Sequence, residues 1–436
     1  MMWPDLQKAF DWQADLPRFV RVRQEFPTPY VGDIRQAVFQ ELERLPDLSR
    51  LVAGKRIAIT AGSRGISEIA AILAALVDGL RQREAQPFIV PAMGSHGGAT
   101  AEGQVQVMAN LGMTEASLGA PILSSMEVVE LGRLSNGMPV YADRLAAEAD
   151  GVVLANRIKP HTDFVADFES GLTKIATLGL GKQKGAETIH SYGVEGLTQW
   201  MPEAARMVVE KLPVLFGLAT IENASHQVAS IRLVPSADIA GPLEKRLLEE
   251  AYRLMPGIPF EEVDVLIVDE MGKNISGVGM DPNVIGRVRV EGVPNPLPLT
   301  IRMIVALRLT DETHGNASGI GLADVTTRQL FDQIDFETTY LNCLTAGICG
   351  IRRGFLPIVA PNDKAAIESA LRCCGQPFPK QARVLRIKNT LSLDQMDVSE
   401  ALLANPIPGR ALFSGGPAFE LAFNPDGSLP AFREAL

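Results

Sequence analysis

Apolar and polar residues alternate along the first hundred residues in a pattern that predicts a βαβ unit. An apolar strand is expected at residues 56–61, an amphipathic helix at 66–84 and a second strand at 87–92, and glycine-containing loops follow both strands. Ligands of such units gather at the carboxyl ends of the strands. We therefore expect Arg64 and His96, which follow the two strands, to lie on one rim.

The same kind of pattern continues through the rest of the chain. An apolar run at 151–156 predicts a strand that brings His161 to the same rim, and a helical pattern at 197–212 precedes a strand around 213–223. A new strand at 263–269 begins a second series of strands and helices, which predicts a smaller α/β sheet.

The predicted fold class is α/β, with two α/β domains, a Rossmann-like second domain and an active site in the cleft between them. A chain of 436 residues exceeds what one hydrophobic core usually serves. We expect a catalytic domain at 1–260 and a second domain at 261–409. The tail at 410–436, rich in Pro and Gly, is expected to pack back on the first domain.

The composition of the chain indicates which partners and which cellular compartment to expect. The formal net charge of -10 argues against a nucleic-acid or anionic-membrane surface, which needs clustered Lys and Arg. The sequence contains no run of 18 apolar residues and no signal peptide, so we expect a cytoplasmic protein. The four cysteines lack repeated CxxC spacing and are interpreted as reduced core thiols.

Histidines carry the first chemical signal. The chain has only five, and three of them, His96, His161 and His190, fall on predicted loop or strand-end positions. Near neutral pH an imidazole can transfer protons or bind a transition metal, and the residues alone leave both roles open.

Lys174 lies between two of these histidines. Its apolar neighbours Leu172 and Ile175 would shield an amine from water and favour its reactive neutral form. A solvent-exposed lysine on a helix is the alternative. The sequence has no G-x-G-x-x-G after the first strand and no Walker A sequence, so common nucleotide-binding fingerprints are missing.

The motifs "AGSRGI", "PAMGSHGGATAEGQ", "KPHTDFVADFESGLTK" and "ETIH" resemble the nickel-pincer lactate racemase family over most of residues 50–290. The resemblance implies a nickel-pincer nucleotide, pyridinium-3,5-dithiocarboxylic acid mononucleotide with nickel, covalently attached to Lys174. It also implies that His190 is the protein's ligand to nickel. One protein ligand suits a square-planar nickel site whose other donors come from the cofactor.

The resemblance further implies an isomerase that racemises or epimerises a 2-hydroxy acid by proton-coupled hydride transfer. His96 and His161 would be the paired acid and base, because inversion in both directions needs a proton-transfer group on each side. Arg64 would bind the substrate carboxylate, and Lys273 is the candidate lysine from the second domain. The implied partners are the small-molecule substrate and the enzymes of cofactor biosynthesis.

Two departures point away from lactate itself. Lactate racemases carry an acidic residue three positions before the arginine and an arginine directly after the first catalytic histidine, where this chain has Ala61 and Gly97. The segment that contains Asp163, Asp167 and Glu169 also looks longer than in those enzymes. We therefore expect another 2-hydroxy acid.

Two alternatives remain open on the sequence. One is a zinc hydrolase that uses His96, His161 and His190 as ligands. The other is a non-catalytic binding protein or cofactor carrier. The oligomeric state is left open.

Four further residues have weaker signals. His226 is expected to be structural, and His314 is a candidate for facing the cleft. Asp281 and Asn283 could line the cleft or form a turn.

Overall fold

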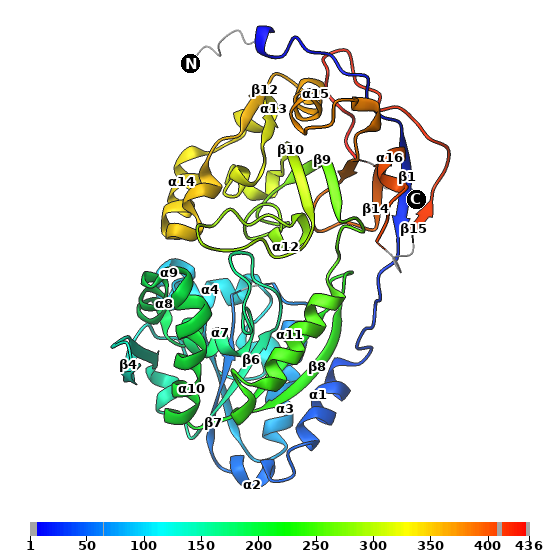
Figure 1. Ribbon diagram of the computed structural model, residues 1–436. Helices are drawn as coiled ribbons and strands as arrows, with labels where there is room; N and C mark the ends of the chain where they lie inside the picture. The colour runs from blue at the N-terminus through cyan, green and yellow to red at the C-terminus, as the bar shows by residue number, and fades with distance from the viewer. Residues whose placement is uncertain (1–6, 64, 408–411, 433–436) are drawn as a thin grey trace. The chain divides into compact units, whose positions relative to one another are not determined.

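The computed structural model describes residues 7–63, 65–407 and 412–432 (Figure 1). The chain divides into two compact units. One is continuous, from Pro27 to Met255, and we call it the inserted unit. The other, the flanking unit, is made of the residues before Pro27 and those after Met255. Both are α/β, so the predicted fold class is confirmed.

The inserted unit is built on a five-stranded sheet of order β3-β2-β6-β7-β8. The first four strands are parallel and β8 is antiparallel to β7. The strands are β2 (Arg56–Ala61), β3 (Gln86–Pro91), β6 (Gly151–Arg157), β7 (Val214–Glu222) and β8 (Val228–Pro235). A separate hairpin pairs β4 (Val128–Arg133) with β5 (Pro139–Asp143). The predicted βαβ unit and the strands at 151–156 and 213–223 are confirmed.

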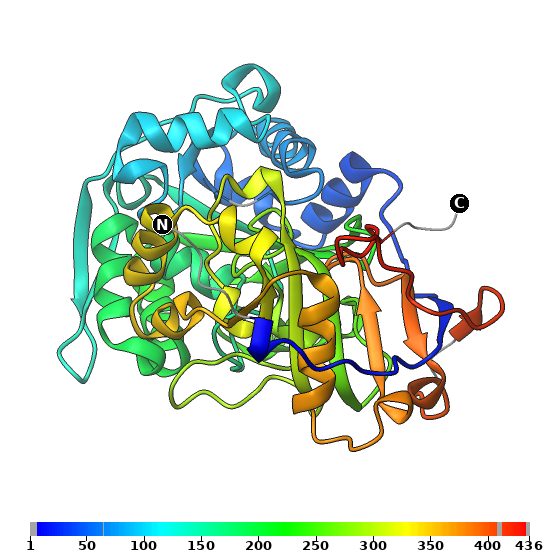
Figure 2. The ribbon, with the colours of Figure 1, turned by 90° about the horizontal axis from the view of Figure 1, so that it is seen from above.

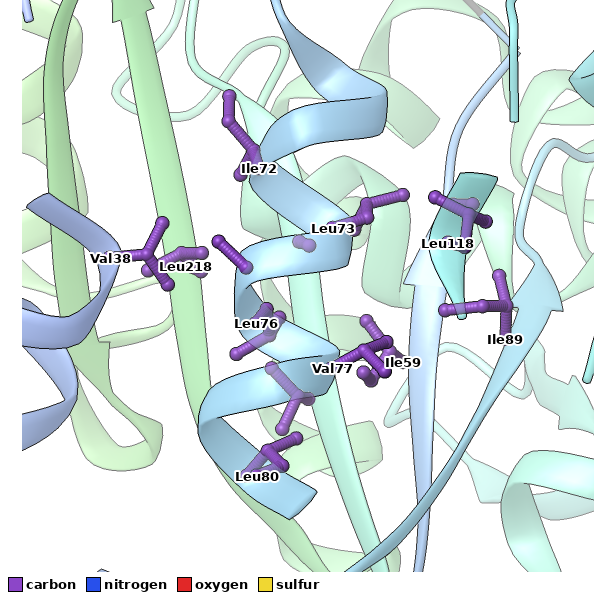
Figure 3. Packing of buried hydrophobic residues seen from close by; sticks show 14 of the residues in the cluster. Val38, Ile59, Ile72, Leu73, Leu76, Val77, Leu80, Ile89, Leu118 and Leu218 are labelled. Carbon is purple, nitrogen blue, oxygen red and sulfur yellow. The ribbon is translucent and has the colours of Figure 1, made fainter. Parts of the chain in front are cut away.

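Helix α3 (Ile69–Arg81) connects β2 to β3 and packs its apolar stripe against the sheet (Figure 3). Its almost fully buried side chains recur every three or four residues, as an amphipathic helix requires: Ile72, Leu73, Leu76, Val77 and Leu80. Ile59 and Ile89 from the two strands belong to the same core.

The other helices of the inserted unit lie between or beside these strands. They are α1 (Ile34–Glu43), α2 (Leu48–Val52), α4 (Ala101–Asn110), α5 (Glu115–Leu118), α6 (Arg144–Ala147), α7 (Leu172–Lys174), α8 (Lys182–Ser191), α9 (Gly193–Glu195), α10 (Met201–Lys211) and α11 (Pro242–Leu254). Single π-helical turns at Ile175–Gly179 and Gly196–Trp200 join α7 to α8 and α9 to α10.

The flanking unit has an eight-stranded sheet of order β12-β11-β10-β9-β13-β14-β1-β15. Its strands are β1 (Phe19–Gln24), β9 (Glu262–Met271), β10 (Thr300–Leu309), β11 (Val325–Thr327), β12 (Ile358–Ala360), β13 (Val384–Ile387), β14 (Gln395–Ser399) and β15 (Leu412–Ser414). The strands from β12 to β13 are parallel, and β14, β1 and β15 continue the sheet with antiparallel pairing.

The ends of the chain differ from the sequence-based expectation. We expected residues 1–260 to form one domain and the tail at 410–436 to pack on it, but β15 pairs with β1 inside the flanking sheet. Figure 2 shows this blue N-terminal strand among the orange and red strands. The reason is antiparallel pairing at long range: Phe19 lies opposite Ser399, and local periodicity carries no signal for such a partner.

The helices of the flanking unit are α12 (Pro282–Ile285), α13 (Arg328–Asp332), α14 (Phe336–Thr345), α15 (Asp363–Cys373) and α16 (Glu400–Leu403). Cys343, Cys349 and Cys374 are buried, as expected of core thiols, whereas Cys373 is exposed. Within the described part of the chain, no helix is long and apolar enough to cross a membrane.

The chain's own last described residues are hydrogen-bonded to buried carboxylates near the carboxyl ends of the flanking strands. The guanidinium of Arg386 donates two hydrogen bonds of 2.7 Å to Asp269. The Phe432 N–H also donates to Asp269 (2.7 Å), and the Leu429 N–H donates to Asp363 (2.7 Å). This edge of the flanking sheet is therefore closed by salt bridges and by the C-terminal segment.

Candidate active site

Two loops meet at the carboxyl edge of the inserted sheet. Ser63 follows β2 and His96 follows β3, and the Ser63 hydroxyl is hydrogen-bonded to Nδ1 of His96. His96 is exposed. The contact supports the predicted meeting of these loops on one rim. Arg64, predicted beside them, lies outside the described residues.

His161 follows β6, the next strand of the sheet, and meets Lys174 directly. The Nζ atom of Lys174 and Nε2 of His161 are 2.7 Å apart and hydrogen-bonded. The imidazole stacks on Phe164 with ring centroids 4.6 Å apart, and its side chain is 13% exposed. The structure thus places a nitrogen base against the amine, and part of the ring stays accessible.

The backbone that carries Lys174 is held by a buried carboxylate. Glu244, from α11, accepts hydrogen bonds from the backbone N–H and the hydroxyl of Thr173, both 2.8 Å long. This satisfies donors at the start of α7 that have no partner within the helix. Burial raises the pKa of Glu244 above its ordinary value, and the hydrogen bonds oppose that shift.

A second carboxylate, Glu169, fastens the loop that carries His161. It accepts hydrogen bonds from the backbone N–H of His161 (2.5 Å) and of Ala166 (3.1 Å), and from the hydroxyl of Tyr252 on α11 (2.9 Å). Burial raises the pKa of Glu169 to about 7. The loop is therefore closed on itself and tied to α11 by one side chain.

His190 lies on α8, which continues from Lys174 through the π-helical turn. Crowding by protein atoms lowers the pKa of His190, although the side chain is accessible to solvent. A lowered pKa leaves the imidazole neutral at physiological pH, and the neutral ring is the form that binds metals.

The zinc site of the alternative hypothesis is not formed. Among the described residues, which include His96, His161 and His190, no group of three or more His, Cys, Asp or Glu side chains is arranged to hold a metal ion. A zinc site needs three or four protein ligands. A metal here would need most of its ligands from another molecule.

The loop that bears His96 rests on a buried lysine. Lys182 is fully buried, lies 3.1 Å from Asp143 and donates to the Gln104 side-chain carbonyl (3.2 Å). Gln104 in turn donates to the Gly94 carbonyl (2.9 Å), two residues before His96. Burial lowers the pKa of Lys182, and Asp143 opposes that shift. Lys182 and Gln104 thus connect the buried Asp143 to the loop that carries His96.

The position after His96 cannot hold a large side chain in this backbone. Gly97 has φ +68°, and a Cβ there would lie 2.4 Å from the carbonyl carbon of Gly103. A positive φ and contact with backbone at that distance both require glycine. The backbone conformation of this loop therefore requires glycine at position 97, where lactate racemases carry an arginine.

Lys273, predicted from the second domain, belongs to the flanking unit. Its Nζ donates to the Gly277 carbonyl (2.6 Å) and to the Asn342 side chain (2.5 Å). Both partners belong to the same unit as Lys273.

The weaker candidates have local structural roles. His226 lies in the exposed turn between β7 and β8 with φ +58°. His314 ends a 3-10 helix with φ +49° and is exposed. Asp281 accepts the Asn283 N–H at the start of α12, so the turn-forming role is the one observed.

Sequence reasoning missed three buried supports of the site: Glu169, Lys182 and Glu244. The position of Glu169 between His161 and Lys174 could have drawn attention to it. In the sequence, this residue indicates only that the substrate pocket differs from that of lactate racemases. Lys182 stands among glycines and polar residues, a context typical of exposed lysines. Glu244 lies far along the chain, so nothing local connects it to Thr173.

Comparisons with known proteins agree with this picture. Residues 24–198 match the family model of the lactate racemase N-terminal domain. The lactate racemase apoprotein from Thermoanaerobacterium thermosaccharolyticum is 14% identical with a TM-score of 0.53, over 86% of this chain and 99% of that chain. A Thermotoga maritima protein is 13% identical with a TM-score of 0.47, over 76% and 83% of the two chains. No curated protein matches.

The structural likeness concerns the fold, and the family model concerns the unit that contains the histidine and lysine cluster. The similarity to lactate racemases therefore covers residues 24–198 in sequence and the fold in structure.

Proposed function

We propose that this chain is a racemase or epimerase of a 2-hydroxy acid other than lactate, and that it uses a nickel-pincer nucleotide attached to Lys174. The observation that carries the proposal is the 2.7 Å contact between Lys174 and His161 at the sheet edge that also bears His96. An attachment point and a proton-transfer group are thus neighbours.

The donor set suits the proposed group. Lys174 is half-buried, so its amine can be reached, and His190 has a lowered pKa that keeps a nitrogen lone pair for a metal. The described residues do not form a metal cage of their own, which fits a cofactor that brings its own donor atoms. When bound, the group supplies a hydride acceptor for the substrate's α carbon.

The protein residues would move the protons. In one direction His161 takes the hydroxyl proton of the substrate and His96 returns a proton after inversion, and in the other direction the roles exchange. On the sequence resemblance, Arg64 is assigned to the substrate carboxylate and Lys273 is the candidate substrate-binding lysine of the second domain. A bidentate guanidinium can hold a carboxylate while the rest of the molecule turns.

The preference for another 2-hydroxy acid rests on two positions. Gly97 has no room for the arginine of lactate racemases, and Ala61 supplies no carboxylate at the buried end of β2. A pocket without these charges would accept a larger or less polar substituent than the methyl group of lactate.

The test is to produce the protein together with the enzymes of cofactor biosynthesis, beside Lys174→Ala, and to measure intact mass and bound nickel. A Lys174-dependent mass increase with one nickel per chain is expected. Chiral separation of a panel of 2-hydroxy acids would then identify the substrate.

An unmodified chain without nickel under these conditions would overturn the proposal. An adduct with nickel but no inversion of any acid in the panel would support a non-catalytic cofactor carrier in its place.

A further inference from the structure

The tautomer of His161 can be deduced from its two hydrogen bonds. The backbone N–H of Asp163 donates to Nδ1 of His161 at 3.1 Å. A backbone amide is always a donor, so Nδ1 must be an acceptor and carries no proton. The proton of a neutral imidazole then sits on Nε2.

That assignment fixes the direction of the second hydrogen bond. Nε2 lies 2.7 Å from Nζ of Lys174. If Nε2 carries the proton, Nζ must accept it, and an ammonium has no lone pair with which to accept. A protonated Lys174 would set two N–H groups against each other at this distance.

We propose that His161 holds Lys174 as a neutral amine, so that the lysine is ready for acylation before the cofactor is attached. The inference rests on the proposed function for the identity of the acylating molecule, but the state of the amine stands on the hydrogen-bond geometry alone. His161 would thus act first on the lysine and later on the substrate.

The surroundings keep this geometry in place. Leu172 and Ile175, the chain neighbours of this segment, are buried and fix the backbone that carries the half-buried Lys174. The ring of His161 stacks on Phe164, and Glu169 holds its backbone N–H at 2.5 Å. Phe164 and Glu169 therefore hold His161 in the orientation in which it contacts Lys174.

Attachment would also release His161. The Nζ lone pair forms a bond to a carboxyl-type carbon of the cofactor, and the bond from that carbon to its oxygen or sulfur breaks. The leaving group departs with one amine proton as water or hydrogen sulfide. The nitrogen of the resulting amide or thioamide is no longer a good acceptor, so the Nε2–H of His161 loses its partner on the lysine.

The test uses cyanate on the protein produced without cofactor-biosynthesis enzymes, with residue-resolved mass spectrometry at pH 7. In this reaction Nζ adds to the carbon of isocyanic acid, one C–N π bond breaks, and an amine proton moves to the nitrogen. An ordinary exposed lysine such as Lys211, whose side chain is 48% exposed, provides the internal reference.

We expect Lys174 to react at least about tenfold faster than Lys211, with an upper limit of about 10³-fold for an amine that is fully neutral at pH 7. In His161→Phe, which keeps a ring on Phe164 but has no hydrogen-bonding nitrogen, the advantage should disappear. His96→Gln should leave it unchanged. Equal rates for Lys174 and Lys211, or an advantage that survives His161→Phe, would overturn the inference.

A second measurement uses the unsubstituted protein, so the inference can be tested even if His161→Phe misfolds. Nitrogen-15 NMR of the histidine-labelled protein distinguishes the two neutral tautomers, and we expect Nδ1 of His161 to be unprotonated. A proton on Nδ1 would overturn the inference. Neither experiment requires nickel, so failure here is distinct from failure to form a Lys174 adduct, which would overturn the proposed function.

Discussion

In both units the carboxyl ends of parallel strands lie along one edge of the sheet, but the side chains at that edge differ between the two units. In the inserted unit the edge carries His161, Lys174 and His96, which can change protonation state and are partly or fully accessible. In the flanking unit the edge carries Asp269 and Arg386, closed by the chain's own last residues. Parallel strands place the loops at their carboxyl ends close together in both units. The residue types in those loops determine whether the side chains there are accessible and titratable or buried in salt bridges.

The charges at the two edges also differ in kind. An arginine keeps its charge at any physiological pH, so the salt bridge between Arg386 and Asp269 is permanent. Imidazole and a partly buried amine exchange protons near neutrality. Variants of the Arg386 and Asp269 pair in the flanking unit should therefore change stability, and variants of the histidines in the inserted unit should change chemistry.

The largest effect is expected for His96→Gln. Loss of one proton-transfer group should lower the rate of inversion by about 10²–10⁴-fold. The free energy of unfolding should change by less than about 0.5 kcal/mol, because the side chain is exposed. Inversion assays with the adduct-bearing protein and urea denaturation test both parts. A rate within tenfold of the unsubstituted protein would remove His96 from the proposed chemistry.

Arg386→Met should show the opposite behaviour. It leaves Asp269 buried without its two 2.7 Å hydrogen bonds, which should cost about 3–5 kcal/mol in the stability of the flanking unit. Hydrogen exchange resolved by segment should show the loss there and not in residues 27–255. The matched control is Arg23→Met, whose partner Glu25 is exposed, and it should cost less than about 1 kcal/mol. Equal losses in the two variants would contradict the comparison.

Leu73→Ala probes the inserted unit through its apolar core. Leu73 is fully buried in α3, and its truncation should lower the free energy of unfolding of this unit by about 2–4 kcal/mol. Leu51→Ala, at a position 37% exposed, is the control and should cost under about 1 kcal/mol. The same segment-resolved exchange is the measurement, and a loss confined to the flanking unit would be unexpected.

Glu169→Gln should give the smallest effect, and one that depends on pH. Because burial raises the pKa of Glu169 to about 7, the folded state binds a proton that the unfolded state releases nearer pH 4.5. The stabilisation from this protonation is complete below the lower value and is lost as pH rises through about 7.

The stability of the unsubstituted protein relative to Glu169→Gln should therefore fall by about 2 kcal/mol between pH 5 and pH 8. Urea denaturation of both proteins at each pH measures this. A difference that does not vary with pH would show that Glu169 is ionised throughout.

Local patterns were sufficient for most of the inserted unit. The strand at 56–61 is β2 residue for residue, and the helix predicted at 66–84 is α3 without three residues at each end. These elements alternate along the chain and pack on their sequence neighbours. The flanking sheet was only partly predictable, because β1 and β15 find each other across almost the whole chain.

The candidate site shows the same division. Few residue types offer the proton-transfer and nucleophilic chemistry of histidine and lysine, so the sequence alone could single out His161 and Lys174, which are in contact in the structure. Carboxylates are common on surfaces, and the pattern gives no way to recognise that Glu244 is buried beneath Thr173. The hydrogen bond between Lys174 and His161 could be recognised only in the three-dimensional structure.

The position of β1 in the flanking sheet has a consequence for protein synthesis. Arg21 on β1 contacts Asp397 on β14, 376 residues later in the chain. At roughly 5–20 residues per second, the ribosome needs roughly 20–75 s to make the second partner after the first. The inserted sheet is complete once β8 has been made, so it can form during this interval. Strand β1 is made before every strand of the inserted sheet but is paired only after that sheet is complete, and its edge is open to unwanted neighbours until then.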